Sequence, residues 1–321
     1  MMMMSSATAL VGQRHTAQLG RAPRPTGTVA GALVPHVPLY LPPETPMHVA
    51  EVLHDLLAEQ RALDSVMADL SDEQWSLPTP SPRWPISDQI GHLAFFDGTA
   101  GLAITDPAGF ATHRSELFTK FADPVSIDAA TLEHFRALAP PNQLTAWRSR
   151  RANLEAAART LADDSRVEWY GPSMGAKSFL TARLMEVWAH GQDVVDALEN
   201  AGLAVDRPDT DRLRHIAQLG VITRGWSYLV RSESAPDADV LVELAAPSGD
   251  VWTWGSPDAS ESIKGPAGDF CRVVTQRRHV ADTALAVSGA AALDWMRKAQ
   301  AFAGAPTAGP AAGSTRFASP S

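Results

Sequence analysis

The sequence predicts a helical domain followed by a small α+β domain. Apolar residues recur every three or four positions in long stretches up to about residue 232, which is typical of amphipathic helices. After Pro236 the pattern changes to short apolar segments separated by turn residues, as expected for strands. Residues 1–46 and 305–321 show neither period and are rich in small residues and proline, so we expect a disordered extension and a disordered tail.

Composition excludes several classes of partner. The formal net charge of −9 and the absence of basic runs argue against binding to nucleic acid or to an anionic membrane. No apolar run approaches the roughly 20 residues needed to span a bilayer. Cys271 is the single cysteine of the 321 residues, so an intrachain disulfide is impossible, and we expect a cytoplasmic protein.

The predicted helical domain covers residues 47–232. Met47 begins the first well-patterned segment, so we expect residues 1–46 to be an extension upstream of the natural start. A second helix is predicted over residues 85–100, with Ser87 as its N-cap. Residues 105–125 give no clear pattern. Further helices are expected over residues 128–138, 144–161, 180–198 and 209–230, and a four-helix bundle is the natural packing for them.

The predicted α+β domain covers residues 237–304. VLVELAAP and VWTWG flank a Ser-Gly-Asp turn and read as a hairpin. A third strand is expected over residues 261–264, and Gly265-Pro266 then opens a helix that runs to about Gln276. LAVSG reads as a fourth strand and residues 290–303 as a closing helix.

The helix predicted over residues 180–198 carries two potential metal ligands. Glu186 and His190 are four residues apart, so their side chains lie on the same helix face. A carboxylate and an imidazole held in this way form two corners of a metal site. The alternative is that this face is the solvated polar side of an ordinary amphipathic helix.

A third potential ligand, His92, lies in the apolar stretch IGHLAFF. A histidine in such a helix is expected to be buried and to need a partner, so it either completes a site with Glu186 and His190 or is satisfied within the core. Asp88 and Asp193 lie one turn from the two histidines and are placed to orient them, although capping or a surface ion pair would explain them equally well. Arg183 is placed either to pair with Glu186 or to contact an acidic substrate.

Together these motifs resemble a known family. The stretch WPISDQIGHLAFFD, the distant EVWAHGQDV and the later SIKGPAGDFCRVVTQRR are similar to the mycothiol-dependent maleylpyruvate isomerase family, and closest to a branch sometimes labelled with a wyosine-base-formation name. The resemblance implies a DinB-like four-helix bundle followed by a small sterol-carrier-like α+β domain. It also implies a divalent metal, usually zinc, bound by His92, Glu186 and His190.

The same resemblance implies a function. The metal would activate mycothiol, a small thiol cosubstrate, for addition, isomerisation or S-transfer on a small electrophilic and acidic substrate. Arg277 and Arg278 are the candidates for the arginine that holds the substrate carboxylate in such isomerases. Two other classes remain open from the residues alone: a metal-dependent hydrolase, since an open zinc position also activates water, and a protein that binds metal or ligand without catalysis.

Overall fold

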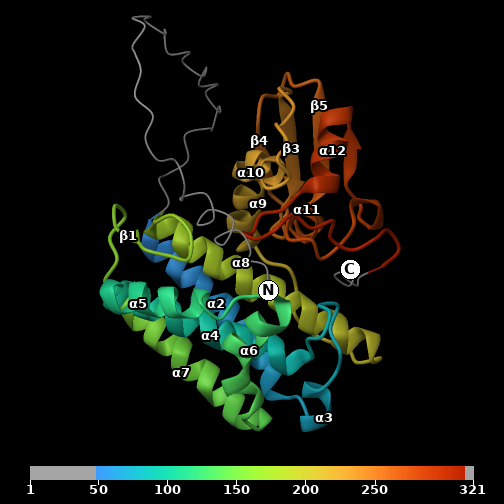
Figure 1. Ribbon diagram of the computed structural model, residues 1–321. Helices are drawn as coiled ribbons and strands as arrows, with labels where there is room; N and C mark the ends of the chain where they lie inside the picture. Colours follow the sequence, from blue (N-terminus) through green and yellow to red (C-terminus); the bar gives the residue numbers. More distant parts are fainter. Residues whose placement is uncertain (1–47, 315–321) are drawn as a thin grey trace, which may run out of the picture.

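The structure is a computed structural model that describes residues 48–314. Its helices are α2 (Val49–Ala68), α3 (Asp72–Trp75), α4 (Ile86–Thr105), α5 (Pro107–Phe118), α6 (Pro124–Arg136), α7 (Pro140–Ala158), α8 (Ala176–Asn200), α9 (Leu213–Ile222), α10 (Arg224–Leu229), α11 (Ala267–Val274) and α12 (Ala290–Lys298), with a 3-10 turn at Val280–Asp282. Its strands are β1 (Arg166–Val167), β2 (Met174–Gly175), β3 (Val240–Ala245), β4 (Val251–Trp254), β5 (Glu261–Pro266) and β6 (Ala286–Ser288). The mixed helical and sheet content predicted from the sequence is confirmed (Figure 1). The disorder predicted for residues 1–46 and 315–321 falls outside the described residues.

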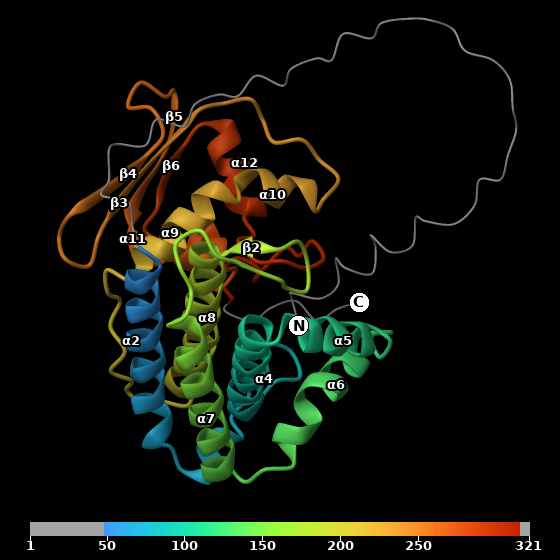
Figure 2. The same ribbon diagram turned by 90° about the vertical axis from the view of Figure 1, so that its left-hand side faces the viewer.

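Four long helices, α2, α4, α7 and α8, pack into a bundle. α4 contacts α7 and α8, and α2 contacts the same two helices. Figure 2 shows the four running roughly alongside one another below the sheet. Each presents buried apolar residues at helical spacing to a shared core, such as Leu56, Leu93, Leu154 and Leu184. The bundle therefore surrounds one apolar interior into which any buried polar side chain must fit.

Two shorter helices, α5 and α6, lie against α4. α5 falls in the region that gave no clear sequence pattern, whereas α6 corresponds to the helix predicted over residues 128–138. Both begin with an Asp-Pro pair. The Asp106 side chain accepts a hydrogen bond from the backbone of Gly109 at 2.9 Å, and Asp123 accepts one from Ser126 at 2.8 Å. Asp as N-cap followed by Pro at the first helical position is a known start signal. The start of each helix is therefore encoded locally, although the weak amphipathic pattern of α5 left that helix unpredicted.

The second part of the chain is built on a four-stranded sheet in the order β4-β3-β5-β6. β3 pairs antiparallel with β4 and parallel with β5, and β5 pairs antiparallel with β6. α11 and α12 pack on the sheet strands, and α9 contacts both α11 and α8. We call residues 213–302 the sheet region. Within it, α9 is a helix that contacts α8 and so connects the sheet region to the bundle (Figure 1).

Several predicted element boundaries differ from the structure, and three of the differences have a local cause. α4 begins at Ile86 with Pro85 as N-cap, so Ser87 lies inside the helix. The single helix expected over residues 209–230 is interrupted at Thr223, whose hydroxyl donates to the Leu219 carbonyl at 2.7 Å, a contact that bends helices. The closing helix stops at Lys298 because the chain turns to place the Gln300 backbone N–H on Ser227 Oγ at 3.0 Å.

The predicted tail also differs over the residues that the structure describes. Residues 305–314 lie on the sheet region and make hydrogen bonds with it. The Gln276 amide donates to the Thr307 carbonyl at 3.0 Å, and the Gly313 backbone N–H donates to Asp282 at 2.8 Å. Composition alone predicted disorder because it does not show these distant partners. Among residues 48–314, no helix combines the length and apolar character needed to cross a bilayer.

Candidate metal centre

Helices α4 and α8 carry the three predicted ligands and pack directly against each other. On α8, every residue from Arg183 to Leu198 is buried, because this helix is enclosed by α2, α4 and α9. Glu186 and His190 are only 7% and 8% exposed, and His92 is 3% exposed. The face of α8 that carries Glu186 is therefore an interior face, and the alternative of a solvated polar side is wrong.

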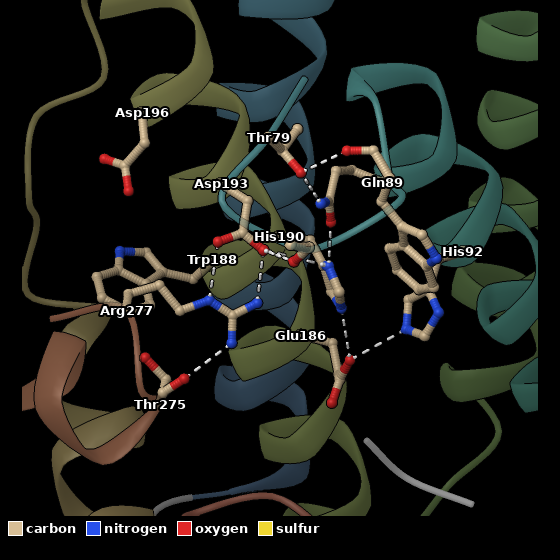
Figure 3. Close-up of polar contacts among 12 residues, drawn as sticks. Thr79, Gln89, His92, Glu186, Trp188, His190, Asp193, Asp196, Thr275 and Arg277 are labelled. Atoms are coloured by element: carbon tan, nitrogen blue, oxygen red, sulfur yellow. Dashed lines mark hydrogen bonds and ion pairs between the residues drawn. The ribbon is translucent and has the colours of Figure 1, made fainter. Parts of the chain in front are cut away.

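The three side chains converge (Figure 3). Glu186 Oε2 lies 3.1 Å from His190 Nε2 and 3.4 Å from His92 Nε2. One potential ligand atom from each residue lies within 4.8 Å of those of the other two. Ligand atoms at about 2.1 Å from a tetrahedral zinc ion are separated from one another by roughly 3.4 Å. The two measured separations therefore fit the edges of a zinc coordination tetrahedron.

Gln89, which the sequence reading did not single out, sets the orientation of His190. His190 Nδ1–H donates to Gln89 Oε1 at 2.5 Å. The Gln89 amide nitrogen donates to Thr79 Oγ1 at 2.8 Å, and the Thr79 hydroxyl in turn donates to the Trp84 carbonyl at 2.7 Å. Because the Gln89 amide nitrogen is bound to Thr79, only the amide oxygen of Gln89 faces the imidazole of His190. Nδ1 of a neutral His190 therefore carries the proton, and the lone pair of Nε2 points at Glu186.

The consequence is an electrostatic conflict that a cation resolves. His190 Nε2 and Glu186 Oε2 are both electron-pair donors, yet they lie 3.1 Å apart in a buried site. Two such atoms repel unless a proton or a metal ion lies between them. The residues present therefore fit a divalent ion by donor type, by separation and by tautomer.

Protonation states also suit metal binding. Burial, together with the charge of the neighbouring His190, lowers the pKa of His92 well below 6.5, and burial likewise lowers the pKa of His190. Burial acts to raise the pKa of Glu186, but its contacts with His190 and His92 outweigh this and hold it well below 4.5. Near neutral pH the set is two neutral imidazoles and one carboxylate, which is the form that binds metal.

These shifts predict how the metal-free protein responds to pH. The unfolded chain takes up protons on His92 and His190 near pH 6.5, whereas the folded protein does so only at lower pH. The free energy of unfolding should therefore fall as the pH decreases from about 7 to about 5. Urea unfolding midpoints of chelator-treated protein would measure this. The His92→Gln/His190→Gln variant should show a shallower fall, and equal slopes for the two proteins would contradict the assignment.

Aromatic rings enclose the two histidines on the side of α4. The Trp84 ring lies 5.1 Å from the His92 ring and 6.0 Å from that of His190, and Phe96 lies 4.6 Å from His92, measured between ring centroids. Trp84 and Phe96 are themselves nearly fully buried. They limit the access of water to the ligands and fix the plane of the His92 ring by packing.

The two predicted supporting aspartates take different roles. Asp88 does not orient His92. Arg136 on α6 forms a two-point ion pair with it, at 2.6 Å for the closest atoms, and both residues line a separate cavity of about 560 Å³ that contains none of the three ligands. Asp193 is near its predicted position, but its Oδ2 lies 3.9 Å from His190 Nδ1, beyond hydrogen-bond distance. The side chain that supports His190 is thus Gln89.

The arginine candidates are all engaged in buried or partly buried ion pairs. Arg183 does not pair with Glu186; it binds Asp97 on α4 at 2.8 Å, and both are fully buried. Arg277 binds Asp193 at 2.9 Å, and Arg278 binds Asp196 at 2.7 Å. Spacing from Glu186 suggested Arg183, and the family resemblance suggested Arg277 and Arg278. Neither shows which carboxylates from other elements contact these arginines in the folded protein.

Comparison with known proteins places this site in a family context. The family model described as the mycothiol maleylpyruvate isomerase N-terminal domain matches residues 56–195, a span that includes His92, Glu186 and His190. Two uncharacterized proteins from two strains of Mycobacterium tuberculosis are each 46% identical over 258 residues, covering 79% of this chain and 96% of the relative. A crystal structure of a mycothiol-dependent maleylpyruvate isomerase is 16% identical with a TM-score of 0.49, covering 75% of this chain and 93% of that one. A histidine-to-alanine mutant of such an isomerase gives a TM-score of 0.48 at 16% identity, covering 71% and 88%.

Proposed function

This chain belongs to the mycothiol maleylpyruvate isomerase family, and from that premise we propose that it is a metal-dependent enzyme that activates a small thiol of the mycothiol type. The metal we propose is zinc, and the ligands are His92, Glu186 and His190. Within this proposal the bundle is the DinB-like part, the sheet region is the sterol-carrier-like part, and the protein acts in the cytoplasm.

One observation carries the proposal. Two imidazole nitrogens and a carboxylate oxygen converge in a buried site where Gln89 already occupies the outer nitrogen of His190. Three protein ligands leave a position open on a four-coordinate ion, which distinguishes a reactive site from a closed structural one. A divalent ion held there would bind a thiol in that position and stabilise its thiolate form.

The chain's own residues prepare that chemistry. His92 and His190 contribute no charge as neutral ligands, while the Glu186 carboxylate reduces the net charge of the site by one. Gln89 keeps the His190 Nε2 lone pair directed inward, and Trp84 and Phe96 keep water from the ligands. Partial exclusion of water strengthens the attraction between a cation and a thiolate.

For substrate we propose a small acidic molecule with an electrophilic double bond, of which maleylpyruvate is the family's example. The thiolate sulfur adds to one carbon of the double bond and forms a C–S bond, and the electron pair moves onto the adjoining conjugated carbonyl. Rotation about the resulting single bond and loss of the thiolate then restore the double bond with the opposite geometry, without net oxidation. Arg277 and Arg278 bind Asp193 and Asp196 rather than a substrate carboxylate, so we do not assign them that role.

A reconstitution experiment tests the proposal. Chelator-treated protein should be reloaded with zinc and assayed for maleylpyruvate isomerisation with and without mycothiol. Turnover should require both the metal and the thiol. Separately, adding mycothiol to cobalt-loaded protein should produce a sulfur-to-cobalt charge-transfer absorption, and the Glu186→Gln variant should lose it. Metal-dependent turnover that needs no thiol, or no such absorption in the unaltered protein, would contradict the proposal and favour a hydrolase.

A further inference from the structure

The nearest carboxylate to the outer nitrogen of His190 is not the group that binds it. Asp193, one turn further along α8, is completely buried, and its Oδ2 lies 3.9 Å from His190 Nδ1. The neutral Gln89 oxygen occupies that nitrogen at 2.5 Å instead. A carboxylate is ordinarily the stronger acceptor for an imidazole N–H, because hydrogen bonds to a charged group are about twice as strong as neutral ones. Something must therefore restrain Asp193.

Arg277 supplies that restraint from the sheet region. Its Nε donates to Asp193 Oδ1 at 3.2 Å and its Nη2 donates to Oδ2 at 2.9 Å, a two-point contact that fixes the carboxylate plane (Figure 3). Ser81 Oγ also donates to Oδ2 at 3.1 Å. Both oxygens of Asp193 are thus occupied by donors other than His190.

The sheet region aims Arg277 by a specific backbone conformation. Gln276, at the end of α11, has φ of 59°, a left-handed conformation that is unusual for a residue other than glycine. Its side-chain amide donates to the carbonyls of Ala299 and Thr307, both at 3.0 Å, and Arg277 Nη1 donates to the Thr275 carbonyl at 2.8 Å. Contacts with Ala299 and Thr307 on two other segments, and one contact within the turn itself, therefore fix the turn that presents Arg277 to α8.

We propose that Arg277 is a positioning residue that withholds the Asp193 carboxylate from the metal ligand His190, so that the neutral Gln89 remains its partner. The inference rests on the proposed metal site. A carboxylate partner makes a ligating histidine more basic and gives more negative charge to the ion. An amide partner leaves the ion more electropositive, which favours the thiolate over the thiol at the open position. The sheet region thereby tunes a metal centre whose ligands all lie in the bundle.

The first test uses the metal-free protein with ¹⁵N-labelled histidine. In the Arg277→Gln variant the freed Asp193 carboxylate should replace Gln89 as acceptor. The His190 Nδ1–H proton should then move downfield, as expected for a bond to a charged acceptor. Zinc affinity should rise by up to about 10-fold, the lower end of the range for changes in residues that support a ligand. The double variant Arg277→Gln/Asp193→Asn should return both readouts to their original values.

Arg278→Gln is the matched control, because it removes the adjacent ion pair with Asp196 at the same interface. It should leave the His190 signal and the zinc affinity unchanged. If Arg277→Gln does not fold, Asp193→Asn alone decides, since it removes the carboxylate and should leave the Gln89 bond and its proton signal in place. A shifted His190 signal in Asp193→Asn, or an unshifted one in folded Arg277→Gln, would overturn the inference. Failure of the unaltered protein to bind zinc would instead overturn the proposed function.

Discussion

Replacing His190 with alanine should remove most of the bound metal from the purified protein. The substitution deletes one of three protein ligands and leaves Glu186 without the nitrogen that lies 3.1 Å away. The loss of zinc affinity should exceed the roughly 10–100-fold that follows from removing a residue that merely supports a ligand. Metal content by elemental analysis, and competition with a chromophoric chelator, would measure the effect.

His215→Ala is the matched control. His215 is also a buried helical histidine with a carboxylate partner, since its Nε2 lies 2.8 Å from Asp55 Oδ2, but it belongs to α9 and not to the converging set. This variant should retain the metal content of the unaltered protein. Equal metal loss in the two variants would show that the effect is general destabilisation, and retention of metal by His190→Ala would place the ion elsewhere.

Replacing Asp97 with alanine should cause the largest loss of stability among single substitutions near the site. Asp97 is fully buried and accepts hydrogen bonds from Arg183 at 2.8 Å, from Trp147 at 3.0 Å and from Gln60 at 3.3 Å. Removing it leaves the Arg183 guanidinium buried without its counter-ion, which costs about 3–5 kcal/mol. Urea unfolding followed by circular dichroism would measure the change in the free energy of unfolding.

Glu155→Ala provides the comparison. Glu155 forms an ion pair with Arg159 on the exposed side of α7, where such pairs contribute at most about 1 kcal/mol. The two variants each remove one carboxylate from an arginine, so the difference between them isolates the effect of burial. A loss below about 1 kcal/mol for Asp97→Ala would lie within the range of exposed pairs. It would mean that water reaches the Arg183 guanidinium inside the bundle.

Local patterns were sufficient to predict the main elements. The 3.6-residue period identified α2, α4 and α8, and the change of period after Pro236 identified the strands of the sheet. The same period failed for α5 because its apolar residues do not form one stripe, although the Asp106-Pro107 start signal was present. The same period predicted α9 and α10 as one helix, because the interruption at Thr223 does not change the composition of the segment.

The candidate site was predictable where it depended on one helix and much less so where it depended on several. The spacing of Glu186 and His190 fixes their shared face, and the apolar surroundings of His92 indicated burial. The role of Gln89 could not be predicted without the contact between α4 and α8. The position of Gln89, one turn before His92 in an apolar helix, was nevertheless a signal that its amide would be buried and would require a partner. Asp88 was misjudged because Arg136, which binds it, arrives from another helix.

X-ray absorption at the zinc edge of the reloaded protein tests the central claim most directly. The claim is that two histidines and one carboxylate hold an ion with a position open to a thiol. The spectrum should show two imidazole nitrogens at about 2.0–2.1 Å and a further oxygen or nitrogen shell near the same distance. On addition of mycothiol, one light scatterer should be replaced by a sulfur at about 2.3 Å. A zinc environment without two imidazoles, or one that gains no sulfur when the thiol is present, would contradict the account.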